Sequence, residues 1–332
     1  TDEAVKFIDD NKDQPFFLYL THYAVHTPIQ AKDEITVKYQ SKTPGQHQKN
    51  TKYAAMIESV DDSVGRVLAK VGDLGLTDNT VVVFYSDNGG HMGATSNHPL
   101  RGAKGMLYEG GIREPFIVRW PGVTNAGSRC SEPIIGVDLY PTFMEITNSG
   151  MNEDYDLDGL SIVPLLKDSA ASLQREALFW HFPCYLQGTG DPHGGPFRTT
   201  PAGAIRMGDW KAVAPIGEPW ELYHLVVDRR ETQDLAVPRA EKLQELVTEW
   251  KSHVDGFTEL ATRDLPADVR QKVKDAANYS IEIKDKQAAG KPKRKQVLLG
   301  GKTFLLNGRH VFLMEPAKNS EAETSDAGGE KP

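Results

Sequence analysis

The sequence predicts an α/β protein with a mostly parallel, helix-covered sheet, followed by a smaller α+β subdomain. Two continuous apolar runs, residues 15–20 and 81–85, have the composition of strands that are buried on both faces. The stretch between them, residues 52–71, repeats apolar side chains at helical spacing. A strand, a long helix and a second strand in this order indicate a βαβ unit and hence a parallel sheet.

Further elements follow along the chain. A helix is expected at the first residues, because Val5 and Ile8 have helical spacing, and a third buried strand is expected over residues 115–120. Beyond about Asp168 short strand-like stretches alternate with many prolines and glycines, and a helix over 239–254 ends this region. We therefore predict a core unit over residues 1–168 and an α+β subdomain over 169–257.

The remaining residues, 258–332, read as a linker, a hairpin and a tail. Residues 284–295 are basic and poor in large apolar side chains. Two apolar stretches flank Asn307-Gly308, a pair that favours a tight β-hairpin turn. The last dozen residues are rich in Ser, Glu, Ala and Gly, which is typical of disorder.

The bulk composition is that of an ordinary globular protein. The chain has 332 residues, 39% of them hydrophobic and 25% charged. A net charge of −8 argues against non-specific binding of nucleic acid, and no apolar run approaches the roughly 20 residues that span a bilayer. The two cysteines, Cys130 and Cys184, do not make a disulfide framework, although they can form one bridge. We expect both to be small, buried side chains with a structural role.

The stretch Ser86-Asp87-Asn88-Gly89-Gly90 follows the second predicted strand. A carboxylate beside a carboxamide offers hard oxygen ligands, which suit Ca²⁺ or Mg²⁺ better than zinc. In open α/β sheets ligands bind at the carboxyl ends of the strands, where Asp87 and Asn88 lie. The alternative is a simple turn, which is the commoner meaning of such a motif alone.

Two basic residues are candidates for binding an anion. Lys104 lies between small residues, so that its ammonium can approach a tetrahedral oxyanion without steric cover. His26 follows the first predicted strand, where an imidazole can donate to an anion or protonate a leaving group. The alternatives are a solvated basic loop for Lys104 and a histidine bonded to its own loop for His26.

Taken together, these segments resemble a known family. The stretches THYAVHTP, VVVFYSDNGG and PLRGAKGMLYEGGIREPFIVRWPG are similar, in order and spacing, to the type I, formylglycine-dependent and arylsulfatase-like sulfatases of the alkaline-phosphatase superfamily. AIRMGDWKAV and WELYHLVVDRRETQDLA extend the resemblance into that family's C-terminal subdomain, to about Asp255. It implies an incomplete alkaline-phosphatase-like fold, with residues 1–168 as the C-terminal part of the catalytic core.

The resemblance implies a sulfuric ester hydrolase that acts on a sulfated small molecule or carbohydrate. Asp87 and Asn88 match ligands of one Ca²⁺ ion. Lys104 matches the lysine that contacts the sulfate, and His26 the histidine that contacts sulfate and helps the leaving oxygen depart. The family's hydrated formylglycine attacks sulfur.

Three weaker candidates surround this site. His98, shortly before Lys104, is expected to touch substrate, with a surface loop as the alternative. His181 is a second substrate-binding candidate from the subdomain, with packing in an aromatic cluster as the alternative. Glu109 and Arg113 are expected to form a buried pair that shapes the loop containing Lys104, called the lysine loop below.

The sequence departs from the family pattern in one respect. It contains no Cys/Ser-x-Pro-x-Arg motif, from which formylglycine is made, since Cys130 has its proline at the wrong spacing. We therefore expect an N-terminally truncated and inactive piece whose nucleophile and remaining calcium ligands lie upstream. Export to the periplasm or the extracellular space is expected from the resemblance alone, because no signal peptide can be read, and nothing indicates an oligomeric state.

Two alternatives stay open. One is a phosphomonoesterase or phosphonate hydrolase of the same superfamily, although a single hard cation fits the Asp-Asn pair better than two zinc ions would. The other is a non-catalytic sulfatase remnant, which the missing nucleophile motif makes a serious option.

Overall fold

The computed structural model describes residues 1–150, 156–182, 202–215, 218–262, 266–268, 295–299, 302–307 and 310–313. The chain divides into two compact units, residues 1–281 and 282–332. The boundaries at 168 and 257 lie inside the first unit and stay predictions. No helix in the described ranges is long and apolar enough to cross a membrane.

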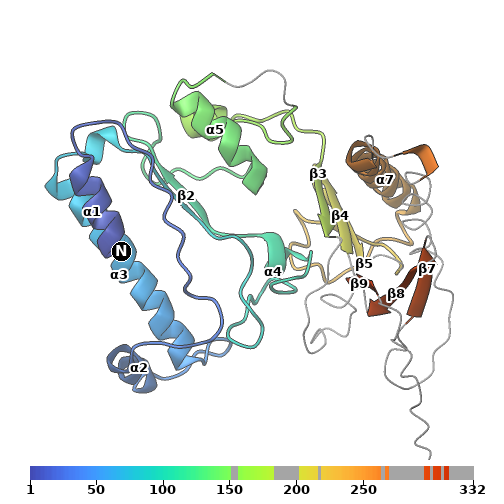
Figure 1. Cartoon of the computed structure of the whole chain (residues 1–332), viewed down its shortest axis with the longest axis horizontal. Helices are drawn as coiled ribbons and strands as arrows, with labels where there is room; N and C mark the ends of the chain where they lie inside the picture. Colours follow the sequence, from blue (N-terminus) through green and yellow to red (C-terminus); the bar gives the residue numbers. More distant parts are fainter. Residues whose placement is uncertain are drawn as a thin grey trace, which may run out of the picture. The chain divides into compact units, whose positions relative to one another are not determined.

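Three helices form one layer of the first unit. α1 (Asp2–Asp10) and α2 (Asp33–Gln40) both pack against the long α3 (Thr51–Asp73), as Figure 1 shows. The Asn50 side chain caps α3 by accepting a hydrogen bond of 3.0 Å from the backbone N–H of Tyr53. The helices predicted from apolar spacing are therefore confirmed.

The mixed α/β class is confirmed, but the strand pairing differs from the expected parallel sheet. β1 (Val82–Tyr85) and β2 (Phe116–Arg119) pair antiparallel, with Val82 opposite Arg119. The chain between them forms the loop that carries Lys104 and the short α4 (Glu109–Ile112) rather than a long crossover helix, so it returns in the opposite direction.

The run at residues 15–20 is extended but forms no strand, which corrects that prediction. A strand exists only where a neighbouring backbone completes its hydrogen bonds, and no strand of the described residues pairs with this run. As a result Phe17 and Tyr19 are 64% and 80% exposed.

Short elements complete the first half of the unit. They are the 3₁₀ turns η1 (Thr77–Asn79) and η2 (Gly136–Asp138) and the helices α5 (Leu139–Ile146) and α6 (Val163–Lys167). Cys130 lies in a connecting segment and is exposed, contrary to the buried position expected of it, while Cys184 lies outside the described residues.

The second half of the unit is an antiparallel sheet in the order β3-β4-β5-β6, covered by α7 (Ala240–Thr262) (Figure 1). Its strands are β3 (Leu178–Phe182), β4 (Ala202–Met207), β5 (Trp210–Pro215) and β6 (Glu221–His224). A Cβ atom at Gly203 on β4 would come within 2.3 Å of the Trp250 ring on α7. A glycine there lets the helix approach the sheet closely.

The second unit holds β7 (Lys295–Leu299), β8 (Lys302–Asn307) and β9 (His310–Leu313) in one antiparallel sheet. Asn307 pairs with His310, which confirms the predicted hairpin. The predicted disordered tail lies outside the described residues, as does most of the predicted basic linker.

Candidate active site

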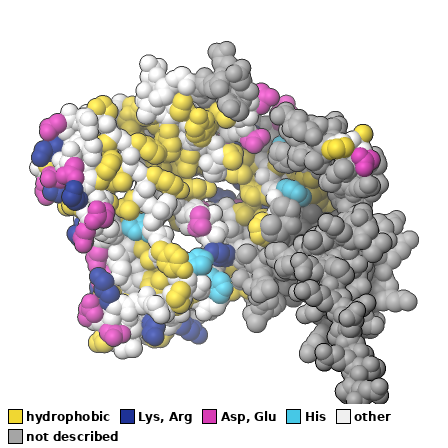
Figure 2. Space-filling view, viewed as in Figure 1, with side chains coloured by type: hydrophobic (Ala, Val, Ile, Leu, Met, Phe, Trp, Pro, Cys, Tyr) yellow, Lys and Arg dark blue, Asp and Glu magenta, His cyan; other side chains and the backbone are white. Residues whose placement is uncertain are grey.

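A large open cavity of about 2210 Å³ lies between α3, the extended residues before His26, and β1. Its lining includes His26, Asp87, Asn88 and Lys104, so the structure brings together four of the six predicted site residues. His98 and His181 are not part of that lining. Figure 2 shows histidine and basic side chains at the edge of the hollow, and hydrophobic side chains gathered over one side of it.

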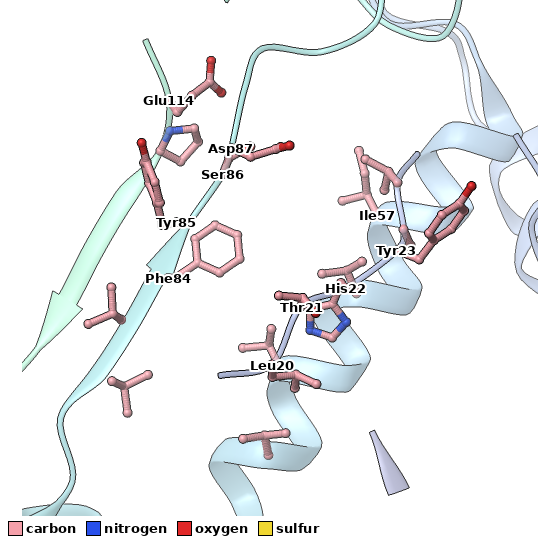
Figure 3. Close-up of a pocket in the computed structure, with 18 of the residues that line it drawn as sticks. Leu20, Thr21, His22, Tyr23, Ile57, Phe84, Tyr85, Ser86, Asp87 and Glu114 are labelled. Carbon is pink, nitrogen blue, oxygen red and sulfur yellow. The ribbon is translucent and has the colours of Figure 1, made fainter. Parts of the chain in front are cut away.

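The inner walls of this cavity are apolar. Figure 3 shows that residues 20–23 run along α3 on one side of the cavity and that β1 lies on the other side. The Phe84 ring of β1 points into the space between them. The volume exceeds the roughly 300–1,000 Å³ of common ligand sites. The candidate site residues therefore lie at the polar end of the cavity, where β1 ends and Asp87 follows.

The Asp87-Asn88-Gly89 turn is held against the segment that precedes β2. The Gly89 N–H donates to the Gly111 carbonyl at 3.1 Å, and the Asn88 amide donates to the Gly89 carbonyl at 3.2 Å. A Cβ atom at Gly89 would lie 1.9 Å from the Gly110 carbonyl oxygen, so only glycine fits this approach. The turn therefore keeps Asp87 and Asn88 at the end of β1.

Glu114 lies beside this turn, and its side chain stands next to Tyr85 (Figure 3). Burial, and then the charge of Asp87, raise the pKa of Glu114 to about 7. Its Oε1 atom is buried and has no hydrogen-bond partner among the described residues. Two carboxylates thus lie close together without a compensating cation, which is the electrostatic environment that attracts one.

The loop that carries Lys104 is fastened to the same turn by Asn97. The Asn97 carboxamide oxygen accepts from the Gly90 N–H at 3.0 Å, and its amide donates to the carbonyls of Gly90 and Gly102 at 3.1 and 3.2 Å. The Lys104 N–H donates to the Gly90 carbonyl at 3.2 Å. Gly102 and Gly105 have φ values of 83° and 84°, which favour glycine.

Lys104 is half-buried and faces the cavity. None of the salt bridges found in the described part of the chain involves its ammonium. A partly desolvated lysine without a carboxylate partner is available to an incoming anion.

A buried ionic network fixes the far end of the lysine loop. The Glu109 carboxylate contacts Arg113 at 3.0 Å, so the predicted pair forms, but it is not fully buried because the Arg113 side chain is 41% exposed. Glu109 also contacts Lys211 on β5 at 2.9 Å. Lys211 in turn contacts Glu231 at 2.8 Å, and Glu231 accepts from the Glu109 N–H at 2.7 Å. The side chains of Lys211 and Glu231 are fully buried.

The pKa shifts of the two glutamates follow from these contacts. Burial alone would raise the pKa of Glu109, but the charges of Lys211 and Arg113 outweigh it and lower that pKa. Burial prevails at Glu231, whose pKa is raised. Lys211 and Glu231 were not predicted from the sequence, although a lysine inside the apolar strand Trp210-Lys211-Ala212-Val213 was a signal for a buried charge.

A second network fixes the near end of the loop. Arg101 donates to the Tyr223 hydroxyl at 2.6 Å and to the Glu221 carboxylate at 3.2 Å. The Tyr108 hydroxyl donates to the same carboxylate at 2.7 Å, and burial together with Glu221 raises the pKa of Tyr108. Both ends of the lysine loop are therefore held by the antiparallel sheet of the second half.

One ring nitrogen of His26 bonds its own loop. Its Nδ1 lies 2.9 Å from the Thr27 carbonyl oxygen, so Nδ1–H donates there. The ring is exposed and lies 5.5 Å from that of Tyr23. The bond to its own loop thus involves Nδ1, and in the described residues no hydrogen bond occupies Nε2.

The two weaker histidine candidates lie elsewhere. His98 is exposed, and its ring stacks on that of His47 with centroids 3.8 Å apart. His181 on β3 is exposed but its ring packs edge-on against Trp250 at 5.8 Å, and partial desolvation lowers its pKa. This contact agrees with the alternative of an aromatic cluster for His181.

The chain is similar in sequence to known sulfatases. A family model described as sulfatase matches residues 1–149, and one described as the C-terminal region of N-sulphoglucosamine sulphohydrolase matches residues 102–259. A sulfatase of Formosa agariphila is 38% identical over 200 residues, or 56% of this chain and 36% of its own length. Human steryl-sulfatase is 33% identical over 195 residues, with 56% and 32% covered.

Solved structures give the same result. The crystal structure of Ps i-CgsB matches with a TM-score of 0.66 and 30% identity, over 81% of this chain and 60% of that one. The same protein has been solved with k-i-k-neocarrahexaose. A structure in complex with its substrate D-glucosamine-2-N,6-O-disulfate matches with a TM-score of 0.50 and 25% identity, over 65% and 41%.

These matches, together with the site geometry, define the class of protein. Over residues 1–259 the chain belongs to the sulfatases of the alkaline-phosphatase superfamily. The chain spans about a third of the length of the curated relatives given above.

Proposed function

We propose that this chain carries part of the active site of an arylsulfatase-like sulfuric ester hydrolase that acts on sulfated carbohydrate. The observation that carries the proposal is Lys104, an ammonium that faces the same cavity as His26 and has no carboxylate partner among the described residues. The relatives solved with k-i-k-neocarrahexaose and with D-glucosamine-2-N,6-O-disulfate support a carbohydrate substrate.

Lys104 and His26 have separate tasks in this proposal. The Lys104 ammonium binds the sulfuryl oxygens and stabilises the negative charge that grows on them as the ester bond breaks. His26, with Nδ1 bound to the Thr27 carbonyl, directs Nε2 to the leaving oxygen and gives it a proton. A protonated imidazole is needed for that step.

Asp87 and Asn88 fit a hard cation in donor type. Their oxygens suit Ca²⁺, and the unpartnered Oε1 of Glu114 beside Asp87 shows a local excess of negative charge. The described residues hold no group of three or more His, Cys, Asp and Glu side chains, whereas Ca²⁺ takes about six to eight oxygen ligands. Other ligands must complete the shell; once bound, the ion would stabilise charge on the sulfuryl oxygens.

The proposed nucleophile is a formylglycine, and the remaining calcium ligands and this residue would come from sequence upstream of Thr1. The chain itself has no Cys/Ser-x-Pro-x-Arg motif. Export from the cytoplasm is part of the same proposal.

The test is turnover by the chain joined to the sequence encoded before Thr1, co-expressed with a formylglycine-generating enzyme. We expect release of sulfate from a sulfated sugar and a strong loss of kcat in Lys104→Gln. The control Lys251→Gln, at an exposed position of α7, should change kcat little. The proposal fails if the upstream sequence holds no Cys/Ser-x-Pro-x-Arg motif, or if Lys104→Gln and Lys251→Gln are equally active.

A further inference from the structure

His47 and His98 each adjoin in sequence a residue that lines the cavity of the proposed sulfate site, Gln48 and Asn97 respectively. The rings of His47 and His98 stack with centroids 3.8 Å apart and 19° between their planes. Partial desolvation, followed by the charges of His47 and Arg230, lowers the pKa of His98, so the Arg230 charge acts on that ring. All three side chains are exposed.

This cluster, His47, His98 and Arg230, carries no compensating carboxylate in the described part of the chain. None of its members forms a salt bridge there. Asp228, two residues before Arg230, accepts hydrogen bonds from Thr232 and Gln233, and Glu231, directly after Arg230, contacts Lys211 instead. Like charges gathered without a counter-charge repel one another, and a bound anion relieves that repulsion.

His47 is held in place by the residue after it. The Gln48 amide donates to the Ser96 carbonyl at 2.6 Å, and its carboxamide oxygen accepts from the Thr95 hydroxyl at 2.6 Å. These two bonds tie the segment of His47 to the segment of His98. The stack is therefore supported from both sides, rather than being a chance contact of two mobile rings.

His98 and Arg230 are each adjacent in sequence to a residue that is held by hydrogen bonds or an ion pair. Asn97, directly before His98, bonds Gly90 and Gly102 and so links the cluster to the loop of Lys104. Glu231, directly after Arg230, is fully buried against Lys211. A site whose groups are held by their neighbours loses little entropy when a ligand binds.

We propose that His47, His98 and Arg230 form a second anion subsite, which binds another sulfate group of a multiply sulfated carbohydrate. The proposal rests on the proposed function, because the scissile sulfate is taken to lie at Lys104. Imidazolium and guanidinium groups are donors that make charge-assisted hydrogen bonds to such an oxyanion. The related protein solved with a disulfated glucosamine shows that a substrate with two sulfates suits this fold.

The subsite has a defined pH dependence. An anion binds the imidazolium form of His98, and the lowered pKa of His98 means that the free chain holds this form only at acidic pH. Affinity for the second sulfate therefore rises as pH falls below about 6.5, the ordinary pKa of histidine, and binding takes up protons.

The test is calorimetric titration of the chain with D-glucosamine-2-N,6-O-disulfate and, separately, with D-glucosamine 6-sulfate, at about pH 5.5 and about pH 8. We expect the disulfate to bind more tightly than the monosulfate at the lower pH only. Because exposed charge pairs contribute modestly, His47→Gln and Arg230→Gln should each weaken disulfate binding about two- to fivefold and leave the monosulfate unchanged. Arg229→Gln, the same change one residue away, is the matched control.

The outcomes separate the two proposals. Equal affinity for both sugars at both pH values, or an equal loss in Arg229→Gln and Arg230→Gln, overturns the subsite and leaves the site at Lys104 standing. If the monosulfate itself binds no more weakly to Lys104→Gln than to the unaltered chain, the proposed function fails first, and the subsite fails with it.

Discussion

Replacement of Lys211 by methionine tests whether the buried ionic network joins the two halves of the first unit. Lys211 is fully buried between Glu109 and Glu231, at 2.9 and 2.8 Å. Methionine keeps most of the volume and removes the charge, so two buried carboxylates lose their shared cation. Removal of one partner of a buried pair costs about 3–5 kcal/mol, against a typical total stability of about 5–15 kcal/mol.

Urea unfolding measures this cost. The exposed pair Lys242 and Glu245 provides the control, because Lys242→Met should change the free energy of unfolding by less than about 1 kcal/mol. The triple variant Lys211→Met, Glu109→Gln, Glu231→Gln should recover part of the loss, since it leaves no uncompensated buried charge.

The sign of the pH dependence adds a second check. In Lys211→Met the pKa values of Glu109 and Glu231 would lie above their unfolded values, so the folded state binds more protons. The variant is then closest to the unaltered protein at acidic pH and loses stability as pH rises. If Lys211→Met costs no more than Lys242→Met, or if its deficit is the same at all pH values, the network does not stabilise the fold as argued.

Three further changes give separate tests. Gly203→Ala would bring a Cβ within 2.3 Å of Trp250, and we expect a loss of about 1–3 kcal/mol by thermal unfolding; an unchanged melting temperature would contradict the close packing. Asn97→Ala removes three hydrogen bonds that hold the Lys104 loop and should weaken monosulfate binding severalfold in calorimetry, whereas equal binding would mean that the loop needs no such support. Burial and Asp87 raise the pKa of Glu114 from 4.5 to about 7, so the folded state binds an extra proton and the unaltered protein loses stability as pH rises from 4.5 to about 7. Glu114→Gln, unfolded in the presence of a chelator, should remove this loss. A pH profile that is the same in both proteins would refute the pKa shift.

Local patterns in the sequence predicted much of the fold. The apolar spacing of α3 and the apolar runs of β1 and β2 depend on neighbours in sequence, and each element formed where expected. The Asp87-Asn88 turn and the Lys104 loop were found for the same reason, because their glycines and polar residues lie together in the chain. Both line the same cavity as His26.

Features that depend on distant partners were missed. The run at residues 15–20 has a strand's composition, yet no strand of the described residues pairs with it, so no strand forms. Lys211 and Glu231 lie 102 and 122 residues from Glu109, and nothing in a local pattern pairs them. The same holds for His47 and His98, whose stacking depends on the bonds of Gln48 to the segment before His98.

The most direct measurement of the central claim is the binding of D-glucosamine 6-sulfate to the chain itself, compared between the unaltered protein and Lys104→Gln. We expect saturable binding that competes with inorganic sulfate, is lost in Lys104→Gln, and is retained in Lys251→Gln. Binding that is equal in all three proteins, or absent from the unaltered chain, would contradict the assignment of this cavity as a sulfate site.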